Sequence, residues 1–511
     1  MRLLWPMLAL LLAGLGGCAT IDFDAPKEES YAPIETEATR LGRWVTEFSG
    51  ERAGQSGFLL VPQPLNAMAF RLSGAGQAEN TIDAMYYLIN ADKAGLLCIN
   101  SLIEAAERGV RVRLLLDDIL TGGYDRGLLA LDAHPNIQIR MFNPFARRGG
   151  ISRGLNFLGD FGRLNRRMHN KAMITDNQVA IIGGRNIGDE YFAAHEVANF
   201  GDMDVLALGP VVREISSMFD LYWNHRLAVP VNLVIEPPEE PFQEIAELRA
   251  RIAVVLQGVD VARYERVVDE IRERERVHHD QLSWVPYDLV YDSPDKADKK
   301  LAAEAETMIP PLRDTIMAGE KELMIVSPYF VPRSTMDGFQ QLRDRGMSVK
   351  IITNSMAANN HLVVHSGYAP SRKPLLKMGA EIYEVRADAK VQGVEKTGVA
   401  RSGGTLHAKV FVVDREELFV GTFNWDPRSK NLNTEMGIIL HAPELARPLA
   451  EAIMRVAPER AYRLRLDDRG KIEWVTQIDG EEVVFKKEPD STWWQRFKVG
   501  FYRILPIKEQ L

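Results

Sequence analysis

Two copies of one short motif carry the residues best suited to chemistry in this chain. The first copy is Met168-His-Asn-Lys-Ala-Met-Ile-Thr-Asp176, and the second is Leu406-His-Ala-Lys-Val-Phe-Val-Val-Asp414. Each reads His-x-Lys-x-x-x-x-Asp and continues into an apolar stretch that ends in a Gly-x-x-Asn turn. A single copy can arise by chance, but a second copy with the same sequel makes coincidence very unlikely.

The spacing within each motif predicts a small cationic pocket. The apolar residues of both copies favour buried strands, on which side chains two positions apart face the same way. His169 and Lys171 should therefore share a face, as should His407 and Lys409. Such a pocket suits a phosphate, because the lysines can bind its oxygens while one imidazole attacks phosphorus and the other protonates the leaving group.

Acids and amides near the motifs complete the expected site. Asp176 and Asp414 lie past the polar turn, and we expect them to orient the imidazoles. Asn186 and Asn424 are expected to help the lysines stabilise charge on the non-bridging oxygens. Three further acids could support the histidines or serve the fold alone: Glu190, Asp202 and Asp204.

The doubled motif resembles that of the phospholipase D superfamily, whose two halves share one active site across a pseudo-twofold axis. Longer stretches resemble its bacterial cardiolipin synthase C-like lipoproteins, among them Arg108–Asp118, Leu164–Lys171 and Ser327–Pro332. The resemblance covers roughly residues 45 to 511. It implies an α/β fold of two phospholipase D-type α-β-α sandwich domains with one shared active site, and chemistry without a metal or other cofactor.

The resemblance also assigns residues outside the motifs to the substrate. Ser429 and Glu435 match polar positions that follow the second motif, and the first half has no counterpart of Ser429. His365 and Arg372 fall at near-helical spacing on a segment that would border the active site. Contact with a lipid head group is expected there, with a plain surface helix as the alternative.

Shifts in pattern divide the chain into segments. Each half shows the strand, helix and strand order of a β-α-β unit, and the run Glu236-Pro-Pro-Glu-Glu-Pro241 marks a boundary between them. We expect a signal peptide at 1–17, a lipid-anchored tether and lead-in at 18–55, a first phospholipase D-like domain at 56–235, a helical connector at 236–303, a second such domain at 304–465, and a hairpin with an amphipathic aromatic segment at 466–511.

The N-terminus predicts export and lipidation. Arg2 precedes an apolar run that is too short to span a membrane comfortably, and Leu15-Gly-Gly-Cys18 resembles a bacterial lipobox in which Cys18 is lipidated. A signal peptide cut elsewhere is the alternative. We therefore expect a lipid-anchored protein on the periplasmic side of a bacterial cell envelope. The outer membrane is favoured over the inner, because Ala19 is not the aspartate typical of inner-membrane retention.

Charge and aromatic residues point towards lipid. The net charge of −8 argues against a dedicated nucleic-acid binder. The stretch 140–171 nevertheless holds eight Lys or Arg and a single acid, Asp160, which predicts either a basic lip for anionic head groups or a solvated loop. From Trp493 onwards, aromatic residues alternate with cations, as in an interfacial membrane helix or a helix packed on the core.

The expected reaction is transfer of a phosphatidyl group through a phosphohistidine. With phosphatidylglycerol as acceptor and phosphatidylglycerol or phosphatidylethanolamine as donor, the product is cardiolipin. With water as acceptor, the product is phosphatidic acid, and a nuclease would use the same motifs on nucleic acid. A non-catalytic lipid-binding protein would require a lost catalytic residue, and both motifs are intact. A separately encoded helper protein would be compatible with the resemblance.

The pair His278-His279 does not have the spacing of a metal site, since adjacent residues do not share a helical face.

Overall fold

The computed structural model describes residues 21–195, 198–236, 241–257, 262–264, 266–267, 269–270, 273, 282–388 and 403–503. The predicted signal peptide, the lipidation site Cys18 and the pair His278-His279 lie outside the described residues. Within them, no helix is both long and apolar enough to cross a membrane.

The first half of the chain forms a sheet whose strand order is β10-β1-β8-β6-β5-β2-β3-β4-β9. Its strands are β1 Gly57–Val61, β2 Thr81–Tyr86, β3 Arg111–Asp117, β4 Ile137–Phe142, β5 Ala172–Thr175, β6 Val179–Gly183, β8 Asp204–Leu208, β9 Ala228–Pro230 and β10 Ser283–Trp284. Its helices are α2 Arg40–Ser49, α3 Pro64–Gln77, α4 Lys93–Glu107, α5 Asp125–Asp132, α6 Gly150–Gly159, α7 Phe161–Leu164, α8 Pro210–Asn224, α9 Val231–Val234 and α10 Pro241–Leu256.

The second half forms a sheet in the order β11-β18-β17-β16-β12-β13-β14-β19-β20-β21. Its strands are β11 Tyr287–Tyr291, β12 Glu322–Val326, β13 Ser348–Asn354, β14 Glu381–Val385, β16 Val410–Val413, β17 Glu417–Gly421, β18 Met436–His441, β19 Ala461–Leu466, β20 Ile472–Ile478 and β21 Glu481–Phe485. Its helices are α12 Ile309–Ala318, α13 Met336–Asp344, α14 Leu362–Tyr368, α15 Arg372–Lys377, α16 Pro427–Asn431, α17 Pro443–Arg460 and α18 Trp493–Tyr502.

The two sheets repeat one topology. The order β1-β8-β6-β5-β2-β3-β4-β9 in the first half matches β11-β18-β17-β16-β12-β13-β14-β19 in the second. In each, three central strands run parallel, β2, β3 and β4 or β12, β13 and β14, and the motif strand β5 or β16 pairs antiparallel with the first of them. The predicted α/β class with two similar domains is confirmed.

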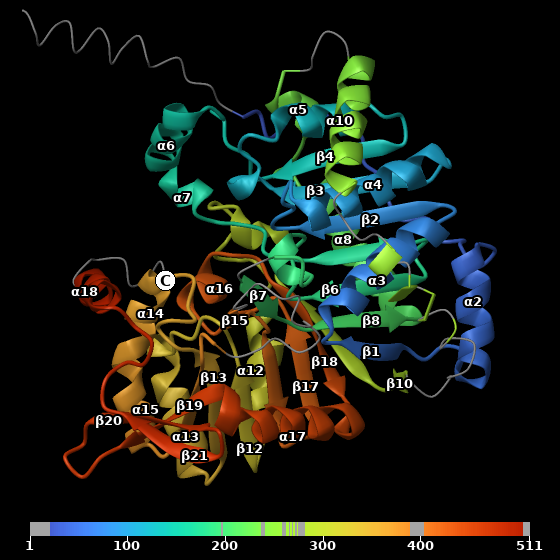
Figure 1. Ribbon diagram of the computed structural model, residues 1–511. Helices are drawn as coiled ribbons and strands as arrows, with labels where there is room; N and C mark the ends of the chain where they lie inside the picture. Colours follow the sequence, from blue (N-terminus) through green and yellow to red (C-terminus); the bar gives the residue numbers. More distant parts are fainter. Residues whose placement is uncertain are drawn as a thin grey trace, which may run out of the picture.

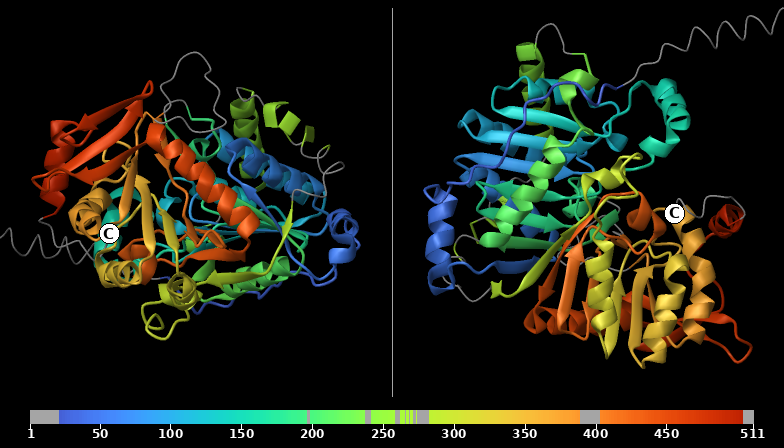
Figure 2. Two further views of the ribbon diagram at one scale, coloured as in Figure 1. Left: turned by 90° about the horizontal axis from the view of Figure 1, so that it is seen from below. Right: turned by 180° about the vertical axis from the view of Figure 1, so that it is seen from behind.

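Burial explains why these segments form sheets with helices on both faces. Every residue of β2 is buried, as are all those of β12, so neither face of these strands meets water. Figures 1 and 2 show the first sheet above the second, with helices such as α4 and α10 on one face of the first and α8 on the other. One cluster of buried apolar side chains extends across both halves, from Ile174 and Met203 to Val410 and Met436.

Two domain boundaries in the structure differ from those expected from the sequence. The second sheet already includes β11, which pairs with β18, so the second domain begins before residue 304. The C-terminal hairpin around Asp479 and Gly480 is confirmed, but β20 pairs with β19 and extends the second sheet. Within the predicted connector 236–303, α10 packs against α4 and α5 of the first half.

A small parallel sheet joins the halves near the motifs. It pairs β7 (Ala198–Gly201) of the first half with β15 (Gly403–Leu406) of the second, immediately before His407. Figure 1 shows β7 and β15 side by side between the two large sheets. The second histidine is thereby placed at the boundary between the two halves.

Candidate active site

Both motif histidines lie just ahead of their strands, and the opposite half fixes their backbone. The β5 strand begins only after Lys171, and β16 only after Lys409. The His169 amide donates to the Thr434 carbonyl at 2.9 Å, and the His407 amide donates to the Gly201 carbonyl at 2.8 Å. The expectation that the histidines sit on the strands is therefore wrong, because pairing across the interface replaces pairing within each sheet.

The motif lysines lie beside their histidines, as predicted. Lys171 Nζ donates to the His169 carbonyl at 2.7 Å, and Lys409 Nζ lies 2.9 and 3.2 Å from the two ring nitrogens of His407. Both lysines are buried. Burial lowers the pKa of Lys171 well below its usual range and lowers that of Lys409 to about 8.

Each imidazole is held by a carboxylate from the other half. His407 Nδ1 lies 2.6 Å from Asp202 Oδ2, and His169 Nδ1 lies 2.8 Å from Glu435 Oε2. The interaction with His407 and the positive charge of Lys409 hold the pKa of Asp202 below its usual range despite burial. Burial and the motif lysines lower the pKa of both imidazoles, that of His407 to about 3. The free site therefore holds neutral imidazoles beside an ionised Asp202.

These contacts correct the expected roles of the motif aspartates. Asp176 accepts hydrogen bonds from the backbone amides of residues 79, 80 and 81, and Asp414 from those of residues 320, 321 and 322. Both sit at the far ends of β5 and β16, with positive φ angles of 50° and 55°. Each aspartate lies five residues beyond its motif lysine, a distance on the order of 16 Å along an extended strand. They fix the turns at the far ends of the motif strands rather than the imidazoles.

Glu435, predicted to contact substrate, instead orients His169. Of the three further acids considered from the sequence, Asp202 holds a histidine, whereas Asp204 pairs with Arg71 and Glu190 accepts a hydrogen bond from Asn90. Asp202 lies two residues before β8, and Glu435 directly precedes β18, the matching strand of the repeat. Because Asp202 and Glu435 precede matching strands of the repeat, a comparison of the two halves of the sequence could have assigned both acids the same role.

Three predicted polar residues lie in the same buried region. Asn186 Nδ2 donates to the Tyr191 hydroxyl at 3.0 Å, and Ser429 Oγ accepts from the Asn424 amide at 3.3 Å. Among the described residues, the buried side-chain oxygens of Asn186 and Asn424 have no hydrogen-bond partner. Buried polar atoms without partners are uncommon, and at a binding site they are available to a ligand.

Comparison with known proteins identifies the family. The family model described as "Cardiolipin synthase, PLD-like domain" matches residues 74–223 and 312–456, which together make up more than half of the chain. The chain belongs to this family, within the phospholipase D superfamily. Each matched region contains one of the two motifs.

Individual relatives agree with this assignment. Cardiolipin synthase C of Escherichia coli is 38% identical over 92% of this chain and 99% of its own. A cardiolipin synthase of Staphylococcus aureus is 23% identical over 74% of this chain and 62% of its own. The crystal structure of phosphatidylserine synthase from Haemophilus influenzae shares the fold, with a TM-score of 0.56 and 14% identity over 93% of this chain and all of that one. The protein is thus an enzyme of the phospholipase D type.

In this phospholipase D-like enzyme, aromatic rings surround both imidazoles. The Tyr87 ring meets His169 edge-on at a centroid distance of 5.1 Å, and the Tyr191 ring meets His407 in the same way at 5.2 Å. Phe200 stacks on His407 from the small β7–β15 sheet at 5.2 Å. No motif in the sequence pointed to these rings.

His365 and Arg372 do not match the expected head-group contacts. Arg372 Nε donates to Glu384 at 2.6 Å, another of its nitrogens pairs with Glu488, and a third lies 3.0 Å from His365 Nε2. Both side chains are buried. Tyr368 also donates to Glu384, at 2.8 Å. This network joins α14 and α15 to β14 and the C-terminal segment, because a buried guanidinium requires carboxylate partners.

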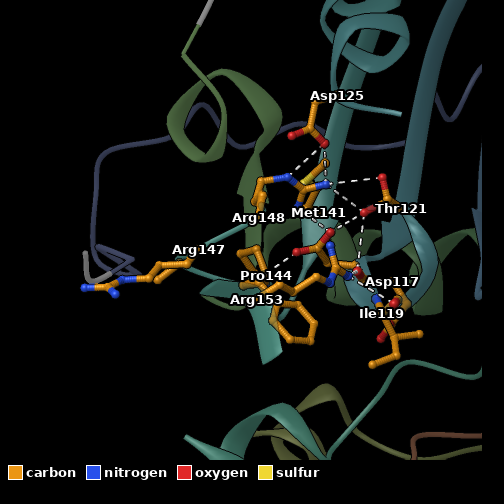
Figure 3. A network of polar contacts seen from close by, with 12 residues as sticks. Asp117, Ile119, Thr121, Asp125, Met141, Pro144, Arg147, Arg148 and Arg153 are labelled. Atoms are coloured by element: carbon orange, nitrogen blue, oxygen red, sulfur yellow. Dashed lines mark hydrogen bonds and ion pairs between the residues drawn. The ribbon is translucent and has the colours of Figure 1, made fainter. Parts of the chain in front are cut away.

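Most cations of the basic stretch 140–171 bind acids or carbonyls within the protein rather than forming a lip or a solvated loop. Arg148 pairs with Asp118 and Asp125 and donates to Thr121, while Arg153 donates to backbone carbonyls in the same loop (Figure 3). In the same figure, Arg147 extends away from this network. The network fixes the loop after β3, and Asp117, the last residue of that strand, accepts the Met168 amide at 2.8 Å, next to His169.

Proposed function

We propose that this enzyme is a cardiolipin synthase, which transfers a phosphatidyl group to phosphatidylglycerol through a phosphohistidine intermediate. The crossed pairs His169–Glu435 and His407–Asp202 carry this proposal, because they place two oriented imidazoles in one site. Two buried lysines adjoin these pairs and favour an anionic substrate. Relatives named cardiolipin synthase support the choice of acceptor.

In the first half-reaction, His169 attacks the phosphorus of the donor phospholipid. A bond forms between its Nε2 and phosphorus, the bond from phosphorus to the head-group oxygen breaks, and that oxygen takes a proton from His407. His169 is favoured as the nucleophile because both ring nitrogens of His407 lie close to the Lys409 ammonium. Lys171 and Lys409 each donate to the carbonyl of their own histidine, but within the described contacts only Lys409 also lies close to ring nitrogens.

In the second half-reaction, His407 removes the proton from the hydroxyl of phosphatidylglycerol. The hydroxyl oxygen attacks phosphorus, and the bond between phosphorus and His169 breaks, which gives cardiolipin. Lys171 and Lys409 stabilise charge on the non-bridging oxygens. The anionic phosphodiester also offsets the field of the two lysines, so its arrival raises the pKa of His407 and lets this residue carry a proton.

The proposed place of action is the periplasmic side of a bacterial cell envelope. The lipobox at Cys18 supports a lipid anchor, and the outer membrane is favoured by Ala19. The donor is phosphatidylglycerol or phosphatidylethanolamine, and a helper protein is compatible with this scheme. The exposed aromatic face of α18 supports contact with a lipid surface.

Lipid analysis of cells that lack their own cardiolipin synthases tests the proposal. Such cells would express the intact chain, His169→Ala or His407→Ala, and their lipids would be separated by thin-layer chromatography and mass spectrometry. Cardiolipin should appear with the intact chain and disappear with both variants. Phosphatidic acid without cardiolipin would instead establish a hydrolase, and unchanged lipids with folded, exported protein would reject both lipid activities for the chain acting alone.

A further inference from the structure

An apolar cavity of about 270 Å³ lies in the first half of the molecule, between the sheet and the helices α4, α5 and α10. These three helices lie together at the top of Figure 1, and α10 packs against both α4 and α5. The volume is about nine times the ~30 Å³ that a water molecule takes in the liquid. The space can thus hold a chain of several carbon atoms.

One end of the cavity reaches the catalytic site. Tyr87 and Asp117 belong to its wall. The Tyr87 ring lies 5.1 Å from the His169 ring, and Lys171 Nζ lies 5.3 Å from the centre of the same tyrosine. Asp117 accepts the amide of Met168, the residue before His169. Tyr87 thus belongs to the wall of the cavity and also packs against the ring of His169, so the cavity adjoins the catalytic site.

The walls of the cavity favour a hydrocarbon. Aliphatic side chains from the sheet and from all three helices line it, among them Ile99, Leu116, Leu128, Leu131 and Leu248. The cationic residues of the lining, Arg126 and Arg251, are exposed on α5 and α10. A polar ligand would lose its hydrogen bonds to water between these walls, whereas an alkyl chain would gain by leaving water.

We propose that this cavity binds one acyl chain of the phospholipid whose phosphate lies between the two motif histidines. The inference rests on the proposed function and adds a binding site for the hydrophobic part of the substrate. An acyl chain in this place would remain bound after the head group departs. It would thereby hold the phosphatidyl group on His169 until the acceptor arrives.

Filling the cavity from α5 tests the proposal. Gly127 belongs to the wall, and a Cβ atom there would meet only Leu248 Cδ1, at 4.0 Å, so Gly127→Phe places a ring in the cavity without a clash against the backbone. Gly338→Phe on α13 is the matched control, because nothing lies within 4 Å of a Cβ at that position. Leu248→Trp fills the same space from α10 and serves where Gly127→Phe does not fold.

The measurement is the dependence of activity on chain length. The substrates are dibutyryl, dihexanoyl and dioctanoyl phosphatidylglycerol, each below its micelle concentration. For the unaltered enzyme and Gly338→Phe, KM should fall about fourfold for each methylene that enters the cavity, since burial of a methylene contributes about 0.8 kcal/mol. For Gly127→Phe or Leu248→Trp, KM should change little between the longer chains. An equal dependence in filled and unfilled enzymes would overturn the proposal.

Binding measured without turnover separates this inference from the proposed reaction. The same lipids would be titrated calorimetrically into His169→Ala, alone and combined with Gly127→Phe. A chain-length dependence that the second substitution removes would support the acyl site even if no cardiolipin forms. The absence of any such dependence in His169→Ala would overturn the site, whatever the reaction proves to be.

Discussion

Asp202 Oδ2 lies 2.6 Å from Nδ1 of His407, although the two residues belong to opposite halves of the chain. Glu435 and His169 repeat the relationship in the other direction at 2.8 Å. Each half thus supplies one histidine and the acid that orients the histidine of the other half. Neither half contains a complete catalytic unit, so activity requires that the two sheets be packed together.

Removing the charge of either acid should impair catalysis without unfolding the protein. Asp202→Asn retains the shape of the side chain but no longer fixes Nδ1 of His407 as a donor, and Glu435→Gln does the same for His169. We expect kcat to fall about 100- to 10,000-fold in each variant, with KM changed far less. Steady-state kinetics on a short-chain phosphatidylglycerol would measure this. Full activity in Asp202→Asn would mean that the imidazole needs no carboxylate.

The motif aspartates should behave in the opposite way. Asp176→Asn and Asp414→Asn weaken the hydrogen bonds that each carboxylate accepts from three consecutive backbone amides. We expect the free energy of unfolding to fall by about 1–3 kcal/mol, while kcat of the folded enzyme stays within severalfold of the original. Denaturant unfolding and kinetics well below the melting temperature would separate the two effects. A loss of kcat as large as that of Asp202→Asn would restore a catalytic role to these residues.

Lys409 should set the alkaline limit of activity. Burial lowers the pKa of this lysine to about 8, so the side chain is cationic below that pH and loses its charge as pH rises through it. Because kcat/KM reports groups of the free enzyme, it should fall with rising pH above about 8. Asp202 raises the pKa of Lys409, so in Asp202→Asn the fall should begin at lower pH. A profile that remains flat well above pH 8 would show that the ammonium charge is not needed.

The sequence predicted the chemistry of the site better than its geometry. The repeated histidines and lysines, the α/β class and the C-terminal hairpin could all be predicted, because each depends on local pattern. Local pattern alone did not assign the acids, because Asp202 and Glu435 reach the histidines only through the packing of the two halves; their equivalent places in the repeat are the one signal that links them. Arg372 was misjudged for a related reason: its partners Glu384 and Glu488 lie on other elements, 12 and 116 residues away, so local spacing did not indicate its burial.

Helix α18 should attach the enzyme to lipid surfaces. Trp493, Trp494, Phe497 and Phe501 are 51–64% exposed, whereas Val499 on the opposite side is buried. The helix packs against α14 and begins with a capping box at Thr492, so its aromatic face is held outward. Figure 2 shows α18 on the same side of the molecule as α6, whose Leu155 and Leu158 are also exposed. Helices with exposed apolar side chains therefore lie on one side of the molecule in both halves.

Replacing part of this face should weaken vesicle binding while leaving the catalytic site intact. For Trp494→Ser combined with Phe497→Ser, we expect affinity for phosphatidylglycerol vesicles to fall at least tenfold, since each buried aromatic side chain contributes about 1.5–3 kcal/mol. Val456→Ser on α17 is the control, because Val456 is an exposed apolar residue away from α18. Flotation with vesicles would measure binding, and kcat/KM on dihexanoyl phosphatidylglycerol below its micelle concentration should stay unchanged. Equal flotation of the double variant and the control would show that membrane contact is made elsewhere. A parallel loss of activity on the soluble lipid would instead place α18 in the support of the catalytic site.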